Sequence, residues 1–204
     1  MTRFYAGAAA ATVVALLTGS AAWIFLAGPQ DAFASCRGGQ GGGGAIGGPF
    51  TLIDESGAAV SDTDVITKPT LVYFGYTFCP DVCPLDAARN AEAVDILEEK
   101  GLDVTLLFIT IDPARDTPAV LAEYTDAIHP GMIGLSGSEE QIKAASQAYK
   151  TYYKKQDSGD DYYLMDHSTF TYLMLPGTGF ADFFKREVTG DQMAERVSCF
   201  LNAI

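Results

Sequence analysis

The chain has 204 residues, a hydrophobic fraction of 48% and a formal net charge of −13 at pH 7. This composition excludes a disordered chain and a membrane protein with many spans. A domain this acidic repels phosphate backbones, so we expect no nucleic-acid partner. All acidic residues except Asp31 and all basic residues except Arg3 lie from Ser35 onward, which assigns the acidity to the C-terminal part of the chain.

The N-terminal stretch from Phe4 to Ala27 carries no charge and is long enough to cross a bilayer as a helix. Because Arg3 precedes this stretch, the positive-inside rule directs the rest of the chain outward. We therefore predict a membrane anchor or signal segment over residues 1–34, with a single pass through the inner (cytoplasmic) membrane and a domain facing the periplasm. The Ala32-Phe33-Ala34 sequence leaves a cleaved signal peptide as the alternative.

The next part of the chain separates this segment from a folded domain. Residues 35–48 predict a flexible tether, because eight glycines fall between Arg37 and Gly48. Residues 49–204 are enough for one domain with its own hydrophobic core.

Within residues 49–204, apolar runs predict strands, and capping residues before apolar periodicity, such as the capping box Ser138-x-x-Gln141, predict helices. In chain order we expect strands at 50–53 and 70–74, a helix at 85–100, a strand at 104–111, a helix at 116–128, a strand at 132–135, a helix at 138–150, an inserted hairpin at 152–163, strands at 168–175 and 180–185, and a helix at 191–203. Alternating strands and helices predict an α/β fold, a three-layer α/β/α sandwich with an inserted hairpin.

Two cysteines, Cys79 and Cys83, lie four residues apart between the strand at 70–74 and the following helix. Asp81 is a suitable N-cap residue, which places both cysteines near a helix N-terminus, where negative charge is stabilised. We therefore expect both thiols to ionise more readily than a free cysteine. Such a pair can cycle between dithiol and disulfide, or it can hold a soft metal ion.

The ligand count favours copper over other soft metals. Two cysteines are too few for an iron–sulfur cluster, and structural zinc needs four protein ligands. Copper accepts two sulfurs and one nitrogen. We expect His167 to supply the nitrogen, because the start of its strand borders the cysteine turn in a thioredoxin-like sheet. His129 follows the end of a helix and is expected to be structural, and Met165 is better explained by packing than as a weak fourth ligand.

Three separated segments, Gly75 to Pro84, Ile111-Asp112-Pro113 and Asp166-His167-Ser168, together resemble the Sco/SenC family of copper-binding proteins with a thioredoxin-like fold. The resemblance covers Gly48 to Phe200, which is nearly the whole predicted domain.

This resemblance implies that Cys79, Cys83 and His167 bind one copper ion per chain, as Cu(I) or Cu(II), and that Asp112 supports the site. It also implies a copper metallochaperone for the CuA site of cytochrome c oxidase subunit II, which delivers copper, reduces the cysteines of that subunit, or does both. Another periplasmic copper chaperone or a thiol reductant is a further candidate partner.

A membrane-anchored periplasmic thiol–disulfide oxidoreductase is the alternative. In this case Cys79 would attack a substrate disulfide, and Cys83 would resolve the resulting mixed disulfide. Whether the chain is an enzyme therefore stays open at this point. Two features argue against this alternative. Three residues separate the cysteines, whereas the common redox spacing has two. In addition, no proline lies beside His167, although thioredoxins share a cis-proline at this place. A peroxiredoxin ranks last, because the P-x-x-x-T-x-x-C pattern is not met.

Two further cysteines, Cys36 and Cys199, lie outside the shared motif. We expect both to be accessible and hypothesise a structural disulfide between them, which would fasten the tether to the closing helix. Free thiols or a bond between two chains are the alternatives.

Overall fold

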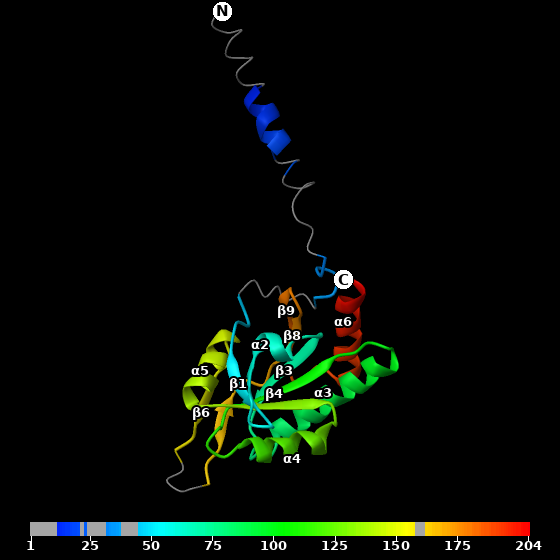
Figure 1. The fold of residues 1–204 in the computed structure, drawn as a ribbon. Coiled ribbons are helices and arrows are strands. Elements are labelled where there is room, and N and C mark those ends of the chain that lie inside the picture. The colour runs from blue at the N-terminus through cyan, green and yellow to red at the C-terminus, as the bar shows by residue number, and fades with distance from the viewer. Residues whose placement is uncertain (1–11, 21–22, 24–31, 38–44, 158–161) are drawn as a thin grey trace, which may run out of the picture. The chain divides into compact units, whose positions relative to one another are not determined.

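The computed structural model describes residues 12–20, 23, 32–37, 45–157 and 162–204 of the chain (Figure 1). The chain forms two compact units, Met1–Ala34 and Ser35–Ile204. In the first unit, residues 12–20 are helical. Among the described residues, no helix combines the length and the apolarity that crossing a bilayer requires. Most of the predicted span from Phe4 to Ala27 lies outside the described residues, and the anchor stays a prediction.

The second unit is built on a mixed sheet of seven strands in the order β2-β1-β5-β4-β3-β8-β9. Its centre consists of three parallel strands, β5 (Met132–Ser136), β4 (Thr105–Thr110) and β3 (Thr70–Gly75). Antiparallel strands flank them: β1 (Thr51–Asp54) and β2 (Ala59–Ser61) beside β5, and β8 (Thr171–Leu175) and β9 (Gly179–Phe184) beside β3. Every residue of β3 is buried, as a strand covered on both faces requires.

Five helices accompany the sheet in this unit's described residues: α2 (Asp62–Val65), α3 (Val82–Glu99), α4 (Pro118–Ile128), α5 (Glu139–Ala148) and α6 (Gly190–Asn202). Side-chain caps define several of their starts. Ser138 and Gln141 form the capping box that was predicted for α5, and Thr189 forms an equivalent box for α6. The short elements β2 and α2 were not predicted, because the segment that forms them is too short for a clear apolar periodicity.

Three helices cover one face of the sheet. The hydroxyl of Tyr73 in β3 donates to Asp86 of α3 at 3.0 Å. On the neighbouring strand, the ring of Phe108 lies 6.1 Å from that of Tyr73 and 5.1 Å from that of Tyr124 in α4. Because α6 packs directly against α3, it belongs to the same layer.

The next residue of β3 points to the opposite face, because side chains alternate along a strand. The ring of Phe74 lies 5.2 Å from that of Tyr149, which follows α5. In Figure 1, α5 accordingly lies on the other side of the sheet from α6. The three-layer α/β arrangement therefore agrees with the prediction.

The inserted hairpin forms a separate two-stranded sheet from β6 (Tyr153–Lys155) and β7 (Met165–His167). His167 is the last residue of β7 and pairs with Tyr153. The prediction that His167 begins the strand of the main sheet was wrong, since β8 begins at Thr171. The backbone N–H of Ser168 still donates to the Tyr152 carbonyl at 2.9 Å, which keeps this segment in the hairpin.

The segment predicted as a tether contacts the domain at both of its ends. Cys36 forms a disulfide with Cys199 of α6, with 5.5 Å between their Cα atoms. The expectation that Cys36 is accessible was wrong, since only 6% of it is exposed. Arg37 Nε donates to the Ala181 carbonyl at 3.2 Å, and the Gly47 N–H donates to the Ala148 carbonyl at 2.9 Å. Residues 38–44 lie outside the described residues.

Candidate metal centre

The turn between β3 and α3 places the two cysteine sulfurs at the start of a helix. Asp81 occupies the N-cap position, but its side chain makes no capping hydrogen bond, so its predicted capping role was wrong. Instead, the sulfur of Cys79 accepts a hydrogen bond from the backbone N–H of Cys83 at 3.3 Å. A sulfur therefore takes the place of the usual side-chain oxygen at this helix N-terminus.

The sulfur of Cys83 lies in a closely packed environment at the end of β3. The residue is fully buried. At Gly75, a Cβ atom would lie 3.1 Å from this sulfur and 2.8 Å from a ring carbon of Tyr73. Because both separations are shorter than ordinary contacts, the absence of a side chain at Gly75 provides the room that the Cys83 sulfur occupies.

His167 reaches the cysteines from the inserted hairpin. Its Nε2 atom lies 3.3 Å from the sulfur of Cys83. Its Nδ1 atom lies 2.8 Å from the Ser168 carbonyl oxygen, which can only accept a hydrogen bond, so Nδ1 carries the ring proton. Nε2 consequently presents a free lone pair toward the sulfurs, which is the tautomer that a metal ligand requires.

Two aromatic rings hold the imidazole in this orientation. The ring of Tyr76 lies edge-on at 5.9 Å from the imidazole centroid, and that of Tyr73 lies edge-on at 6.4 Å. The hydroxyl of Tyr76 also accepts a hydrogen bond from the Met165 N–H at 3.2 Å. The strand that carries His167 is thus connected to the residues just before the cysteine turn.

The two thiols differ in their tendency to ionise. Hydrogen bonds from the Cys83 thiol and from the backbone N–H groups of Asp81 and Cys83 lower the pKa of Cys79 to about 3, although burial opposes this shift. The neighbouring Cys79 sulfur, together with burial, raises the pKa of Cys83. The expectation of easier ionisation therefore holds for Cys79 and is wrong for Cys83, because one thiolate beside another is unfavourable.

The donor atoms of Cys79, Cys83 and His167 all lie within 4.8 Å of one another, close enough to converge on one ion. They are two sulfurs and one imidazole nitrogen, the soft set that suits copper. In the described part of the chain, a second group at this spacing consists of Asp95, Glu98 and His129.

The second group is not suited to a metal ion. The Nδ1 atom of His129 accepts a hydrogen bond from the Gly131 N–H at 3.0 Å, so Nε2 carries the ring proton of the neutral imidazole. This Nε2 lies 3.3 Å from an Asp95 carboxylate oxygen, as expected for a donated hydrogen bond. His129 is the C-cap residue of α4, as its structural interpretation from the sequence predicted.

Asp112, which was expected to support the site, lies between the β4–α4 turn and the hairpin. One carboxylate oxygen accepts from the Tyr163 hydroxyl at 2.8 Å, and the other accepts from Arg115 Nε at 2.5 Å. Sequence reasoning missed Arg115 and Tyr163. Arg115 follows a buried aspartate by three residues, which is a weak signal, whereas Tyr163 is brought to Asp112 only by the folded hairpin.

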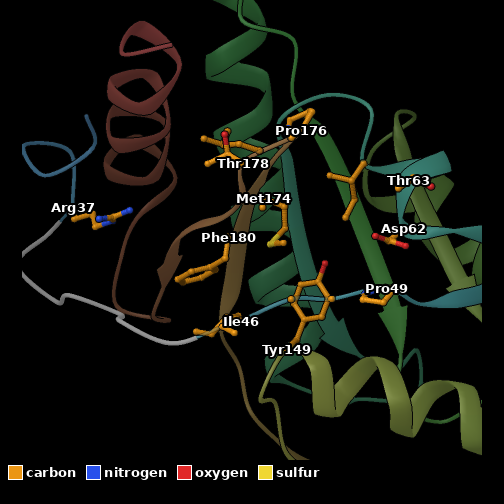
Figure 2. A pocket seen from close by; sticks show the side chains of 17 residues that line it. Arg37, Ile46, Pro49, Asp62, Thr63, Tyr149, Met174, Pro176, Thr178 and Phe180 are labelled. Atoms are coloured by element: carbon orange, nitrogen blue, oxygen red, sulfur yellow. The ribbon is translucent and has the colours of Figure 1, made fainter. Parts of the chain in front are cut away.

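A cavity of about 810 Å³ lies apart from these donors (Figure 2). Residues 45–49, α2 and the turn between β8 and β9 line it, and Tyr149 faces it. Thr70, at the start of β3, pairs with Met174 beside this cavity, whereas Cys79 and Cys83 follow the end of β3. The cavity and the cysteine turn therefore lie at opposite ends of the sheet.

Comparisons with known proteins agree with the fold, and one of the similar structures has copper bound. Residues 38–202 match the family model SCO1/SenC. Protein SenC of Rhodobacter capsulatus is 57% identical over 198 residues, which are 97% of this chain and 90% of that protein. The crystal structure of Arabidopsis thaliana ScoI with copper bound is 41% identical, with a TM-score of 0.75, and covers 78% of this chain and 100% of that chain.

A more distant structure shares the fold. BsSco, a member of the Sco family of cytochrome c oxidase assembly proteins in which a disulfide switch was identified, is 24% identical with a TM-score of 0.60. The match covers 76% of this chain and 93% of BsSco.

Proposed function

The chain belongs to the SCO1/SenC family, and from this premise we propose that it carries one copper ion to the CuA centre of cytochrome c oxidase subunit II. Cys79, Cys83 and His167 would hold the ion as cargo. The observation that carries the proposal is the position of His167 Nε2, 3.3 Å from the Cys83 sulfur and beside the Cys79 sulfur. Copper bound to the related ScoI and the oxidase-assembly role of the family of BsSco support it.

The donors also suggest how binding is controlled. Ligation by thiolates requires the dithiol form of Cys79 and Cys83. Oxidation of the pair to a disulfide removes two of the three donors, so an oxidised chain should release bound copper and should not bind it again. Loading should release a proton, because the Cys83 thiol is protonated before a metal arrives.

We place this domain in the periplasm, attached to the inner membrane by the N-terminal segment. The uncharged stretch from Phe4 to Ala27 with Arg3 before it supports this placement. The disulfide between Cys36 and Cys199 also fits an oxidising compartment.

Copper binding by the reduced full chain, purified in mild detergent, tests the proposal. We expect one copper per chain and a thiolate-to-Cu(II) charge-transfer band in the wild type. His167→Ala should weaken binding and alter the band, whereas His129→Ala, the matched control at the other histidine, should change neither. Absence of stoichiometric copper, or binding that is indifferent to His167, would contradict the proposed site.

Thiol–disulfide exchange is the second candidate function, and the lowered pKa of Cys79 beside the Cys83 thiol favours it. The Cys79 thiolate would attack a disulfide of subunit II and form a mixed disulfide. Cys83 would then attack Cys79, release the second subunit II thiol and leave a Cys79–Cys83 disulfide. The subunit gains two electrons, and the chain loses two.

His167→Ala separates the two functions, because copper transfer needs the imidazole and disulfide exchange does not. If copper delivery is the function, this variant should fail to load apo-CuA domain in vitro while it still reduces an oxidised CuA domain. A wild-type chain that reduces the CuA domain but transfers no copper would favour the oxidoreductase.

A further inference from the structure

We propose that Arg115 is a positioning residue for the copper site, because it fastens the inserted hairpin beside the cysteine turn and so holds His167 against the sulfurs. This inference rests on the copper function proposed above. Arg115 lies between β4 and α4, and it belongs to neither of the two segments that carry the donors.

Arg115 forms a closed set of hydrogen bonds with two other residues, which we call the Arg115 clamp (Asp112, Arg115 and Tyr163). Arg115 donates from Nε to one carboxylate oxygen of Asp112 at 2.5 Å and from Nη1 to the Tyr163 carbonyl at 3.0 Å. The Tyr163 hydroxyl donates to the other oxygen of Asp112 at 2.8 Å. Two of these bonds, from Arg115 to the Tyr163 carbonyl and from the Tyr163 hydroxyl to Asp112, join the β4–α4 turn to the hairpin, and the third lies within the turn.

The same guanidinium contacts aromatic rings on both sides of the site. Its carbon lies 3.6 Å from the ring centroid of Tyr163 in the hairpin and 4.8 Å from that of Phe78, which precedes Cys79. Only 15% of the Arg115 side chain is exposed. Because water is largely excluded, its cation–π contacts and ion pair are stronger than at an open surface.

The hairpin needs such a contact to hold His167 in place. Strands β6 and β7 contain three residues each and pair only with each other. An isolated two-stranded hairpin is marginally stable in water. The Arg115 clamp fixes Tyr163, two residues before β7 begins, and the Tyr76 hydroxyl fixes the N–H of Met165. Without the clamp, the hairpin can move away from α3 and take the imidazole with it.

An arginine suits this role better than a lysine. The planar guanidinium donates from Nε and Nη1 in two directions and stacks on an aromatic ring at the same time. A lysine at this position keeps the charge but cannot make both directed bonds, so it should restore the site only in part.

The test measures Cu(I) affinity by competition with a chromophoric Cu(I) chelator, on the reduced full chain. We expect Arg115→Ala to weaken binding by about 10–100-fold, the usual cost of losing a group that orients a metal ligand. Arg115→Lys should lie between this variant and the wild type. Tyr163→Phe, which removes only the hydroxyl bond to Asp112, should have a smaller effect and covers the case in which the alanine variant fails to fold.

Arg196 provides the matched control. Arg196 forms an ion pair with the buried Asp182, and its guanidinium carbon lies 4.8 Å from the ring centroid of Phe184. These contacts are of the same kind as those of Arg115, but they join α6 to β9, and neither element carries a copper ligand. Arg196→Ala should leave copper affinity unchanged. Hydrogen exchange of residues 153–157 and 162–167 should accelerate in Arg115→Ala and stay unchanged in Arg196→Ala.

A double-mutant cycle with His167 decides whether Arg115 acts through the imidazole. In a His167→Ala background, Arg115→Ala should cause no further loss of affinity, because the ligand that it positions is absent. Wild-type affinity in Arg115→Ala, or an equal loss in both backgrounds, would overturn the proposal. A wild type that binds no copper would instead overturn the proposed function on which it rests.

Discussion

The sulfur of Cys79 accepts a hydrogen bond from the backbone N–H of Cys83 at 3.3 Å, so the first thiol caps the helix that carries the second. This hydrogen bond couples the position of the Cys79 sulfur in the metal site to the first turn of α3. A thiolate at this position satisfies an N–H group that would otherwise lack a partner and lies where a helix favours negative charge.

Cys79 should remain ionised far below the pH at which ordinary thiols protonate, because its pKa is lowered to about 3. In the reduced, copper-free chain, alkylation of Cys79 by iodoacetamide should proceed at about pH 5 at nearly its neutral rate. Cys83→Ala removes the hydrogen-bond donor that makes the largest contribution to this shift, so it should move the alkylation profile to higher pH. A wild-type rate that rises only above about pH 8 would contradict this assignment.

The same shift predicts a pH-dependent stability of the reduced chain. The pKa of Cys79 is lower in the folded state than its ordinary value of 9.0, so its ionisation stabilises the fold. This stabilisation is complete above the unfolded pKa and is lost as the pH falls toward about 3. Urea unfolding at several pH values should therefore show a steeper acid dependence for the wild type than for Cys79→Ser. Equal slopes would argue against the prediction.

Gly75→Ala should damage the site although it replaces none of the three ligands. The added Cβ would lie 3.1 Å from the Cys83 sulfur and 3.0 Å from a ring carbon of Phe108. Overpacking of this kind typically costs roughly 1–3 kcal/mol of the free energy of unfolding. We also expect weaker copper binding, because the sulfur must shift. Gly48→Ala, whose Cβ would meet only Ala148, is the control, and equal effects of the two changes would refute the explanation.

Loss of the Cys36–Cys199 disulfide should destabilise the domain while copper binding persists. The bond joins residues separated by 163 positions, and disulfides typically contribute about 2–4 kcal/mol by restricting the unfolded chain. We expect a Cys36→Ser, Cys199→Ser double variant to unfold at lower urea concentration. A background in which Cys79 and Cys83 are also serine isolates this disulfide from the site pair. No change in the unfolding midpoint there would contradict the prediction.

Asp116→Ala should loosen the cysteine turn. This buried carboxylate accepts hydrogen bonds from the Thr77 N–H at 3.0 Å, from the Thr77 hydroxyl at 2.6 Å and from the Thr110 hydroxyl at 2.5 Å. Removal leaves these donors unpaired and should cost about 2–3 kcal/mol in the free energy of unfolding. The exposed Asp126 of α4 is the control, and Asp126→Ala should have little effect. Comparable losses in the two variants would show that the Asp116 bonds are not the cause.

Several features of the fold could be predicted because they depend on neighbours in the chain. The buried run of β3 and the capping box of α5 are local patterns, and both appear where they were expected. Asp81 shows the limit of local reasoning, because a sulfur occupies the position where its carboxylate was expected to act. Likewise, the apolar run after His167 suggested one continuous strand, whereas Ser168 stays bonded to Tyr152 in the hairpin.

By itself, the sequence determined the alternation of strands and helices, the placement of Cys79 and Cys83 at a strand-to-helix turn, and the candidate histidine. These features follow from short-range periodicity and from the chemistry of individual side chains. Only the tertiary structure decided which cysteine ionises, which tautomer His167 adopts and how Arg115 connects the hairpin to the cysteine turn. Each of these depends on burial and on hydrogen bonds between residues far apart in the chain, which local sequence patterns do not encode.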